Sequence, residues 1–145
     1  MNNDNKNFVI RVYGLFVNSQ KEILVSDEYQ LDMKMTKFPG GGMQFGEGTK
    51  DCLRREIMEE MGQEIEITDH FYTTDYFQPA YFYDNYQLVS IYYLAKFKND
   101  VKFKVSTKPF DFSELIPSYV QSCNIKYIYF DFNIIEQSEF QYNAD

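Results

Sequence analysis

Residues 39–63 read PGGGMQFGEGTKDCLRREIMEEMGQ, and this stretch decides the fold that we expect for the chain. Three glycines follow a proline, so the stretch opens as a loop that is unsuited to a helix or to the core of a strand. A helix is expected to follow, with Thr49 as its N-cap and Gly62 as its left-handed stop. Asp51 would place negative charge at the positive end of the helix dipole.

The predicted helix has an apolar stripe beside an acidic one. At 100° per residue, its apolar side chains share one face: Leu53, Ile57 and Met61. Glu56, Glu59 and Glu60 gather on the adjacent stripe, where exposed like charges cost roughly 0.2–0.5 kcal/mol per pair. A solvated face with salt bridges is the alternative interpretation, but it does not explain a glycine loop at a fixed offset. Carboxylates suit Mg²⁺ or Mn²⁺, so the cluster indicates a divalent-metal site.

The same positions resemble the signature of the Nudix hydrolases. Gly41 is followed by five residues, Glu47, seven residues and then REIMEEMG at 55–62. Two positions depart from the family: Gln63 stands where an aliphatic residue is usual, and Cys52 where alanine is common. The specific motif spans 41–63, and the order of elements agrees over residues 8–98.

The resemblance implies an α/β chain with the Nudix fold, a mixed β-sheet in an α/β/α sandwich. We expect residues 1–145 to form a single domain with frayed ends at 1–7 and 137–145. The family usually adds a second helix. Here residues 113–122 supply it, or it is short or missing and a partner covers that face of the sheet.

The resemblance also implies roles for individual residues. The carbonyl of Gly41 and the three glutamates would bind Mg²⁺ or Mn²⁺. The catalytic set would comprise five residues: Glu47, Arg55, Glu56, Glu59 and Glu60. Arg55 is expected to pair with Glu47 and to hold the loop against the helix. The general base is one of the glutamates or a loop acid, Asp75 or Asp84, and the sequence does not choose among them.

Residues 75–85 (DYFQPAYFYDN) place five aromatic side chains around Pro79. Flat rings stack on nucleobases at roughly 1–3 kcal/mol per base, so Pro79, Tyr81 and Phe82 are the substrate-binding candidates. Nudix members that act on ADP-ribose often have a proline about sixteen residues past the motif, which is the offset of Pro79 from Gln63. The alternative is an aromatic loop that only covers a sheet edge.

The rest of the chain reads mainly as strands. They are expected at 8–17 (buried on both faces), 22–28 (a hairpin with the first), within 31–38, at 64–74 (half exposed), 86–98 (central), 101–105 (pairing back) and 126–135. The lone histidine, His70, lies in an aromatic strand and is interpreted as structural.

Composition excludes several classes of protein. A net charge of −8 over 145 residues argues against a nucleic-acid footprint, because phosphate backbones require a basic face. Two cysteines are too few for a disulfide scaffold. The polar N-terminus and the lack of a long apolar run predict a cytoplasmic protein with no membrane partner. A small-molecule nucleotide is the expected partner, and a homodimer remains open.

The function implied by the resemblance is metal-dependent hydrolysis of the pyrophosphate bond of a nucleoside diphosphate linked to another group. ADP-ribose, a nucleotide sugar or a related dinucleotide would be the substrate. The alternatives are a sanitising (d)NTP pyrophosphohydrolase and a catalytically silent nucleotide-binding sensor. Family sensors usually have a broken glutamate set, whereas Glu56, Glu59 and Glu60 are all present here.

Overall fold

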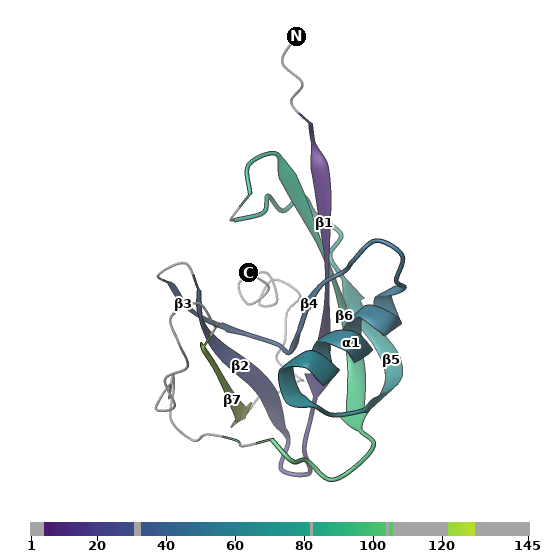
Figure 1. Cartoon of the computed structure of the whole chain (residues 1–145), viewed down its shortest axis with the longest axis vertical. Coiled ribbons are helices and arrows are strands. Elements are labelled where there is room, and N and C mark those ends of the chain that lie inside the picture. Colours follow the sequence, from purple (N-terminus) through teal and green to yellow (C-terminus); the bar gives the residue numbers. More distant parts are fainter. Residues whose placement is uncertain (1–4, 31–32, 82, 104, 106–121, 130–145) are drawn as a thin grey trace.

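The computed structural model describes residues 5–30, 33–81, 83–103, 105 and 122–129, which form two β-sheets and one helix (Figure 1). The elements in chain order are β1 (Asn7–Phe16), β2 (Glu22–Gln30), β3 (Met33–Lys37), β4 (Gly40–Gly42), α1 (Thr49–Met61), β5 (Ile65–Thr73), β6 (Tyr86–Phe97) and β7 (Ser122–Tyr129). Residues 113–121 of the predicted second helix lie outside the described residues, as do 1–4, 130–145 and Phe82, and Ser122 begins β7. None of the described residues forms a helix long and apolar enough to cross a bilayer.

The larger sheet has the strand order β4-β1-β6-β5 and is mixed, as predicted. β1 pairs parallel with β6 along the whole length of β1, from Asn7 opposite Tyr86 to Phe16 opposite Ala95. β4 and β5 pair antiparallel at the two edges. The prediction that residues 86–98 form a central strand is therefore confirmed.

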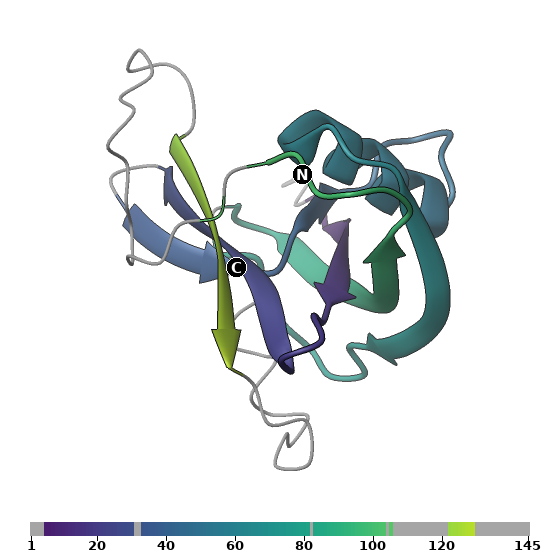
Figure 2. The same ribbon diagram turned by 90° about the horizontal axis from the view of Figure 1, so that it is seen from below.

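The smaller sheet is antiparallel, has the order β3-β2-β7 and lies beside the larger one (Figure 2). The predicted hairpin between residues 8–17 and 22–28 is wrong, because β1 and β2 belong to different sheets. A single bridge, Val17 to Ile23, joins them at the turn. Both edges of β1 are already occupied by β4 and β6, so β2 must pair elsewhere.

The glycines of residues 40–42 form the edge strand β4, so the prediction of an unpaired loop is wrong. Gly40 has φ +145°, and a Cβ there would lie 2.0 Å from the carbonyl oxygen of Val12. A Cβ on Gly41 would lie 2.5 Å from the carboxyl group of Glu56. Glycine is therefore what lets β4 lie close to both β1 and α1.

The predicted apolar stripe of α1 is buried and covers one face of the larger sheet, packing against Val12 and Phe16. A second core cluster lies between the two sheets, where Tyr13 and Leu15 meet Ile23 and Val25. The two clusters place β1 at the centre of the molecule, with α1 on one side and the smaller sheet on the other.

The ends of α1 are only partly as predicted. Gly62 is the left-handed C-cap at φ 65°, which confirms the predicted stop. Thr49 is not the N-cap. Gly48 occupies that position without a side-chain cap, and the hydroxyl of Thr49 instead hydrogen-bonds the hydroxyl of Tyr93 at 2.7 Å. Tertiary contact with β6 therefore takes the hydroxyl away from the helix end.

The expected strand at 101–105 is also wrong for its described residues. The side chain of Gln63 holds this segment instead: its amide oxygen accepts from Lys102 N at 2.9 Å, and its amide nitrogen donates to Asp100 O at 3.4 Å. Gln63 is 4% exposed. The departure from the family pattern at this position therefore replaces apolar packing with a buried hydrogen-bonded clamp.

We expect Gly40→Ala to destabilise the fold by about 3 kcal/mol or more, because its Cβ would meet backbone atoms at a positive φ. Gly42→Ala is the matched control, since a Cβ there meets nothing within 4 Å, and it should change stability by less than about 0.5 kcal/mol. Urea unfolding measures both. Equal effects would contradict the close packing of β4.

Candidate active site

Arg55 is the hub of the polar cluster beside β4. Its Nη2 and Nε donate to the two carboxylate oxygens of Glu47 at 2.7 and 2.9 Å, and Nη2 also donates to Gly42 O at 3.0 Å. Its Nη1 donates to Glu56 at 3.0 Å and to Glu59 at 3.2 Å. The expected pairing of Arg55 with Glu47 is present, and it fixes the loop after β4 against α1.

This ion pair is locked in its charged form. The hydrogen bonds from Arg55 lower the pKa of Glu47 to about 2, and a backbone N–H from Gln44 assists. The pKa of Arg55 is raised, first by its bond to Glu47, against the opposing effect of burial, and then by Glu56. A two-point fork between guanidinium and carboxylate also fixes orientation, so Arg55 presents Nη1 to the other two carboxylates in a set direction.

Glu56 lies directly against the backbone of Gly41, as the 2.5 Å separation of its carboxyl group from a built Cβ shows. Cys52 lies beneath the same glycine, with its Sγ 3.8 Å from Gly41 O. Burial raises the pKa of the Cys52 thiol to about 12, so the sulfur stays protonated. The glycine strand β4 and the Glu56 carboxylate are thus in contact.

Glu60 takes a different partner, Lys37, which sequence reasoning missed. Lys37 Nζ lies 3.5 Å from Glu60 Oε1, 3.2 Å from Glu28 Oε1 and 2.8 Å from Gly40 O. The second oxygen of Glu60, Oε2, is buried without a hydrogen-bond partner. Burial raises the pKa of Glu60 to about 7, although Lys37 opposes that rise.

The three glutamates are therefore divided between two internal cations. Glu56 and Glu59 contact Arg55, and Glu60 contacts Lys37. Within the described part of the chain, no three His, Cys, Asp or Glu side chains are already arranged to hold a metal ion. The donors nevertheless fit a hard divalent cation, because they are carboxylate and carbonyl oxygens and one buried carboxylate oxygen lacks a partner.

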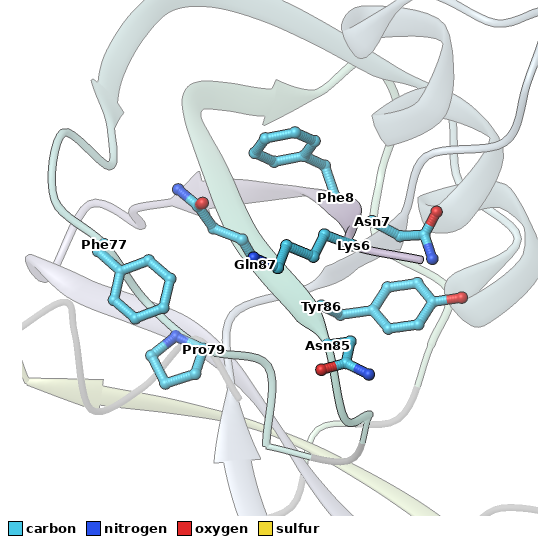
Figure 3. A pocket seen from close by; sticks show the side chains of 8 residues that line it. All are labelled: Lys6, Asn7, Phe8, Phe77, Pro79, Asn85, Tyr86 and Gln87. Atoms are coloured by element: carbon cyan, nitrogen blue, oxygen red, sulfur yellow. The ribbon is translucent and has the colours of Figure 1, made fainter. Parts of the chain in front are cut away.

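Pro79 lines a cavity of about 470 Å³ at the start of β1 and β6 (Figure 3). The lining combines rings with amides and one cation: Phe8, Phe77, Pro79 and Tyr86 with Asn7, Asn85, Gln87 and Lys6. Of the other candidates, Tyr81 is 66% exposed outside this lining, and Phe82 is not among the described residues. The sequence thus found the segment but missed Phe77.

Strand β1 connects the cavity with the strand β4 against which Glu56 lies. Phe8 lines the cavity, whereas Val12 pairs with Gly41. Four residues of strand separate them, about 13 Å at 3.3 Å per residue.

The two candidate loop acids form no ion pair with Arg55 or Lys37 among the described residues. Asp75 accepts a hydrogen bond from the hydroxyl of Tyr72 at 3.1 Å, and Asp84 is exposed. His70 hydrogen-bonds Thr73 at 2.7 Å and lies edge-on to Tyr93, which agrees with a structural role.

Comparison with known proteins fits this geometry. The model of the NUDIX domain matches residues 8–120, which is more than half of the chain. The chain belongs to the Nudix family. No match was found among curated protein sequences.

Solved structures with the Nudix fold resemble the chain at low sequence identity. The Escherichia coli ORF135 protein has a TM-score of 0.57 and 16% identity, over 68% of this chain and 69% of its own. A MutT protein from Methanosarcina mazei has 0.56 and 22%, over 69% and 72%. A UDP-X diphosphatase has 0.56 and 16%, over 83% of this chain and 50% of its own. At these identities the likeness shows the fold.

Family membership makes this protein a pyrophosphohydrolase that acts on nucleoside diphosphate derivatives. Nudix hydrolases generally use divalent cations such as Mg²⁺.

We expect Glu60→Gln to stabilise the metal-free protein at high pH. A folded-state pKa of about 7, against 4.5 for the free group, means that the unfolded chain releases this proton first. Stability is therefore lost as pH rises from about 4.5 through about 7. The neutral amide removes that loss, so its advantage over wild type should grow by roughly 1–3 kcal/mol between pH 5 and pH 8.

Urea unfolding in the presence of a chelator measures this difference. Glu64→Gln, which makes the same change at an exposed carboxylate just after α1, is the matched control. An advantage for Glu60→Gln that shrinks as pH rises would contradict the burial of Glu60.

Proposed function

We propose that this Nudix protein hydrolyses the pyrophosphate bond of a nucleoside diphosphate linked to another group, with Mg²⁺ or Mn²⁺. ADP-ribose is the first candidate, and nucleotide sugars or related dinucleotides follow. The observation that supports it best is the contact of the Glu56 carboxylate with Gly41, with Arg55 holding that carboxylate at 3.0 Å. A side chain at Gly41 would separate the two groups of oxygen donors.

The proposed ligands are the carboxylates of Glu56, Glu59 and Glu60 and the carbonyl of Gly41. A bound divalent ion neutralises phosphate charge and lowers the pKa of a water molecule. Arg55 orients Glu56 and Glu59 for this task, because its fork is fixed by Glu47. Two of these oxygens have fixed positions. Gly41 O is fixed because Gly41 pairs with Val12 of β1. Glu60 Oε2 is fixed because the other oxygen of the same carboxylate, Oε1, accepts a hydrogen bond from Lys37 Nζ.

The substrate's nucleoside is assigned to the cavity beside Pro79. Phe77 and Pro79 lie together on one wall, and the amides of Asn85 and Gln87 offer donors and acceptors (Figure 3). Rings give stacking surface, and amides give the polar contacts that distinguish bases. The four residues of β1 between this cavity and the pairing partner of Gly41 leave a path for the sugar and phosphates.

The substrates to be tested extend beyond ADP-ribose. One similar structure is a UDP-X diphosphatase, which agrees with the proposed class of nucleoside diphosphates linked to another group. Nucleoside triphosphates belong in the panel as the alternative substrates. A silent nucleotide sensor would bind members of the panel without turnover.

We expect Glu56→Gln to reduce kcat by about 10²–10³-fold with Mg²⁺, because it removes one charged ligand and leaves the cavity untouched. Product release from ADP-ribose, UDP-sugars, dinucleotides and triphosphates measures it, with Glu64→Gln as the control on an exposed glutamate. Full activity of Glu56→Gln would refute the ligand assignment. Nucleotide binding without turnover by the wild-type protein would favour the sensor.

We expect Phe77→Ala to raise KM by roughly 5–100-fold with little change in kcat, because about 1–3 kcal/mol of stacking is lost. Phe77 is 72% exposed, so its loss should not disturb the fold. Phe71→Ala is the matched control, an exposed ring of β5 outside the cavity lining. Equal KM changes in both variants would refute the assignment of the nucleoside to this cavity.

A further inference from the structure

The ammonium of Lys37 is enclosed by three oxygens from three different elements. Glu28 of β2 contributes Oε1 at 3.2 Å, Glu60 of α1 contributes Oε1 at 3.5 Å, and Gly40 of β4 contributes its carbonyl at 2.8 Å. The side chains of Lys37 and Glu28 are each 5% exposed. A cation is thus buried where both sheets and the helix meet.

The charge of Lys37 is compensated by its neighbours. The carboxylates of Glu60 and Glu28 and the carbonyl of Gly40 surround the ammonium, which offsets the cost of burying a charge. The ring of Tyr13 lies 6.0 Å from Nζ and adds a weak cation–π attraction. Removing the ammonium would leave the buried carboxylate of Glu28 and the largely buried one of Glu60 with Arg11, which interacts electrostatically with Glu28, as a neighbouring cation.

Two carboxylates and one backbone carbonyl are the donor set that a hard divalent cation prefers. In this chain the amine of Lys37 sits among them. Its positive charge and that of Arg11, which interacts electrostatically with Glu28, face these carboxylates. The amine also binds Glu60 through Oε1, which leaves Oε2 as the free oxygen.

We propose that Lys37 occupies a cation position beside Glu60, and thereby excludes a divalent ion that the oxygens of Glu28, Glu60 and Gly40 would otherwise bind. The inference rests on the proposed function only in treating Glu60 as a metal ligand. Lys37 is then a positioning residue: it fixes Glu60 and limits the number of metal ions at the site.

The direct test counts Mn²⁺ ions bound per chain, by equilibrium dialysis and by the loss of the free-ion paramagnetic resonance signal. Lys37→Ala should bind one Mn²⁺ more than wild type, because the ammonium no longer occupies the space between the oxygens of Glu28, Glu60 and Gly40. Lys37→Ala combined with Glu28→Gln should lose that additional ion and keep the wild-type number. An unchanged count in Lys37→Ala would overturn the proposal.

A second variant covers the case in which Lys37→Ala does not fold. Lys37→Gln keeps most of the length and a hydrogen-bond donor but removes the charge, so Mn²⁺ should bind about tenfold tighter or more at Glu60. Lys37→Arg keeps the charge and should retain the wild-type affinity. Unchanged or weaker binding in Lys37→Gln would mean that Lys37 is only structural.

The same titrations separate this proposal from the proposed function. Wild-type protein that takes up no Mn²⁺, even with nucleotide present, refutes both. Wild-type protein that binds Mn²⁺ through Glu56, with Lys37 variants that behave like wild type, refutes this inference alone.

Discussion

The fork between Arg55 and Glu47 is the contact on which the candidate site depends. Four carboxylates lie on or beside one helix, and their mutual repulsion would spread them into solvent if no cation stood among them. Arg55 meets three of them and also holds the carbonyl of Gly42. The loop after β4, the glycine strand and the acidic face of α1 are therefore joined through a single guanidinium, whose planar geometry sets their relative directions.

Lys37 is a second cation that joins β4 to α1, because it contacts Gly40 O and the carboxylate of Glu60. It comes from the smaller sheet and reaches α1 through Glu60. The two cations together offset the charge of the carboxylates where α1 meets the sheets. A metal ion would have to compete with them, because each proposed ligand carboxylate already has a cationic neighbour.

The sequence predicted the parts of this arrangement that local spacing controls. The apolar stripe of α1, the Gly62 stop and the pairing of Arg55 with Glu47 all follow from residues within one motif. It could not predict the parts that depend on distant pairing. Glu28 and Lys37 become neighbours only because β2 pairs with β3 and both lie against β4 and α1, and no local pattern marks either residue.

The errors have the same origin. The hairpin assigned to the first two strands failed because β4 and β6 occupy both edges of β1. Thr49 was expected to cap its own helix, yet its hydroxyl meets Tyr93 in a strand more than forty residues later. Gln63 stands where the family usually has an aliphatic residue, and its side chain accepts a hydrogen bond from Lys102 N.

The buried thiol of Cys52 has a consequence for the chemistry that the site can survive. Oxidants and alkylating reagents attack the thiolate, and with a pKa of about 12 this sulfur is almost never in that form. It is also covered by the glycine strand that it supports. A thiol next to the candidate site is thus kept inert by packing, and a separation of β4 from α1 would expose it to damage.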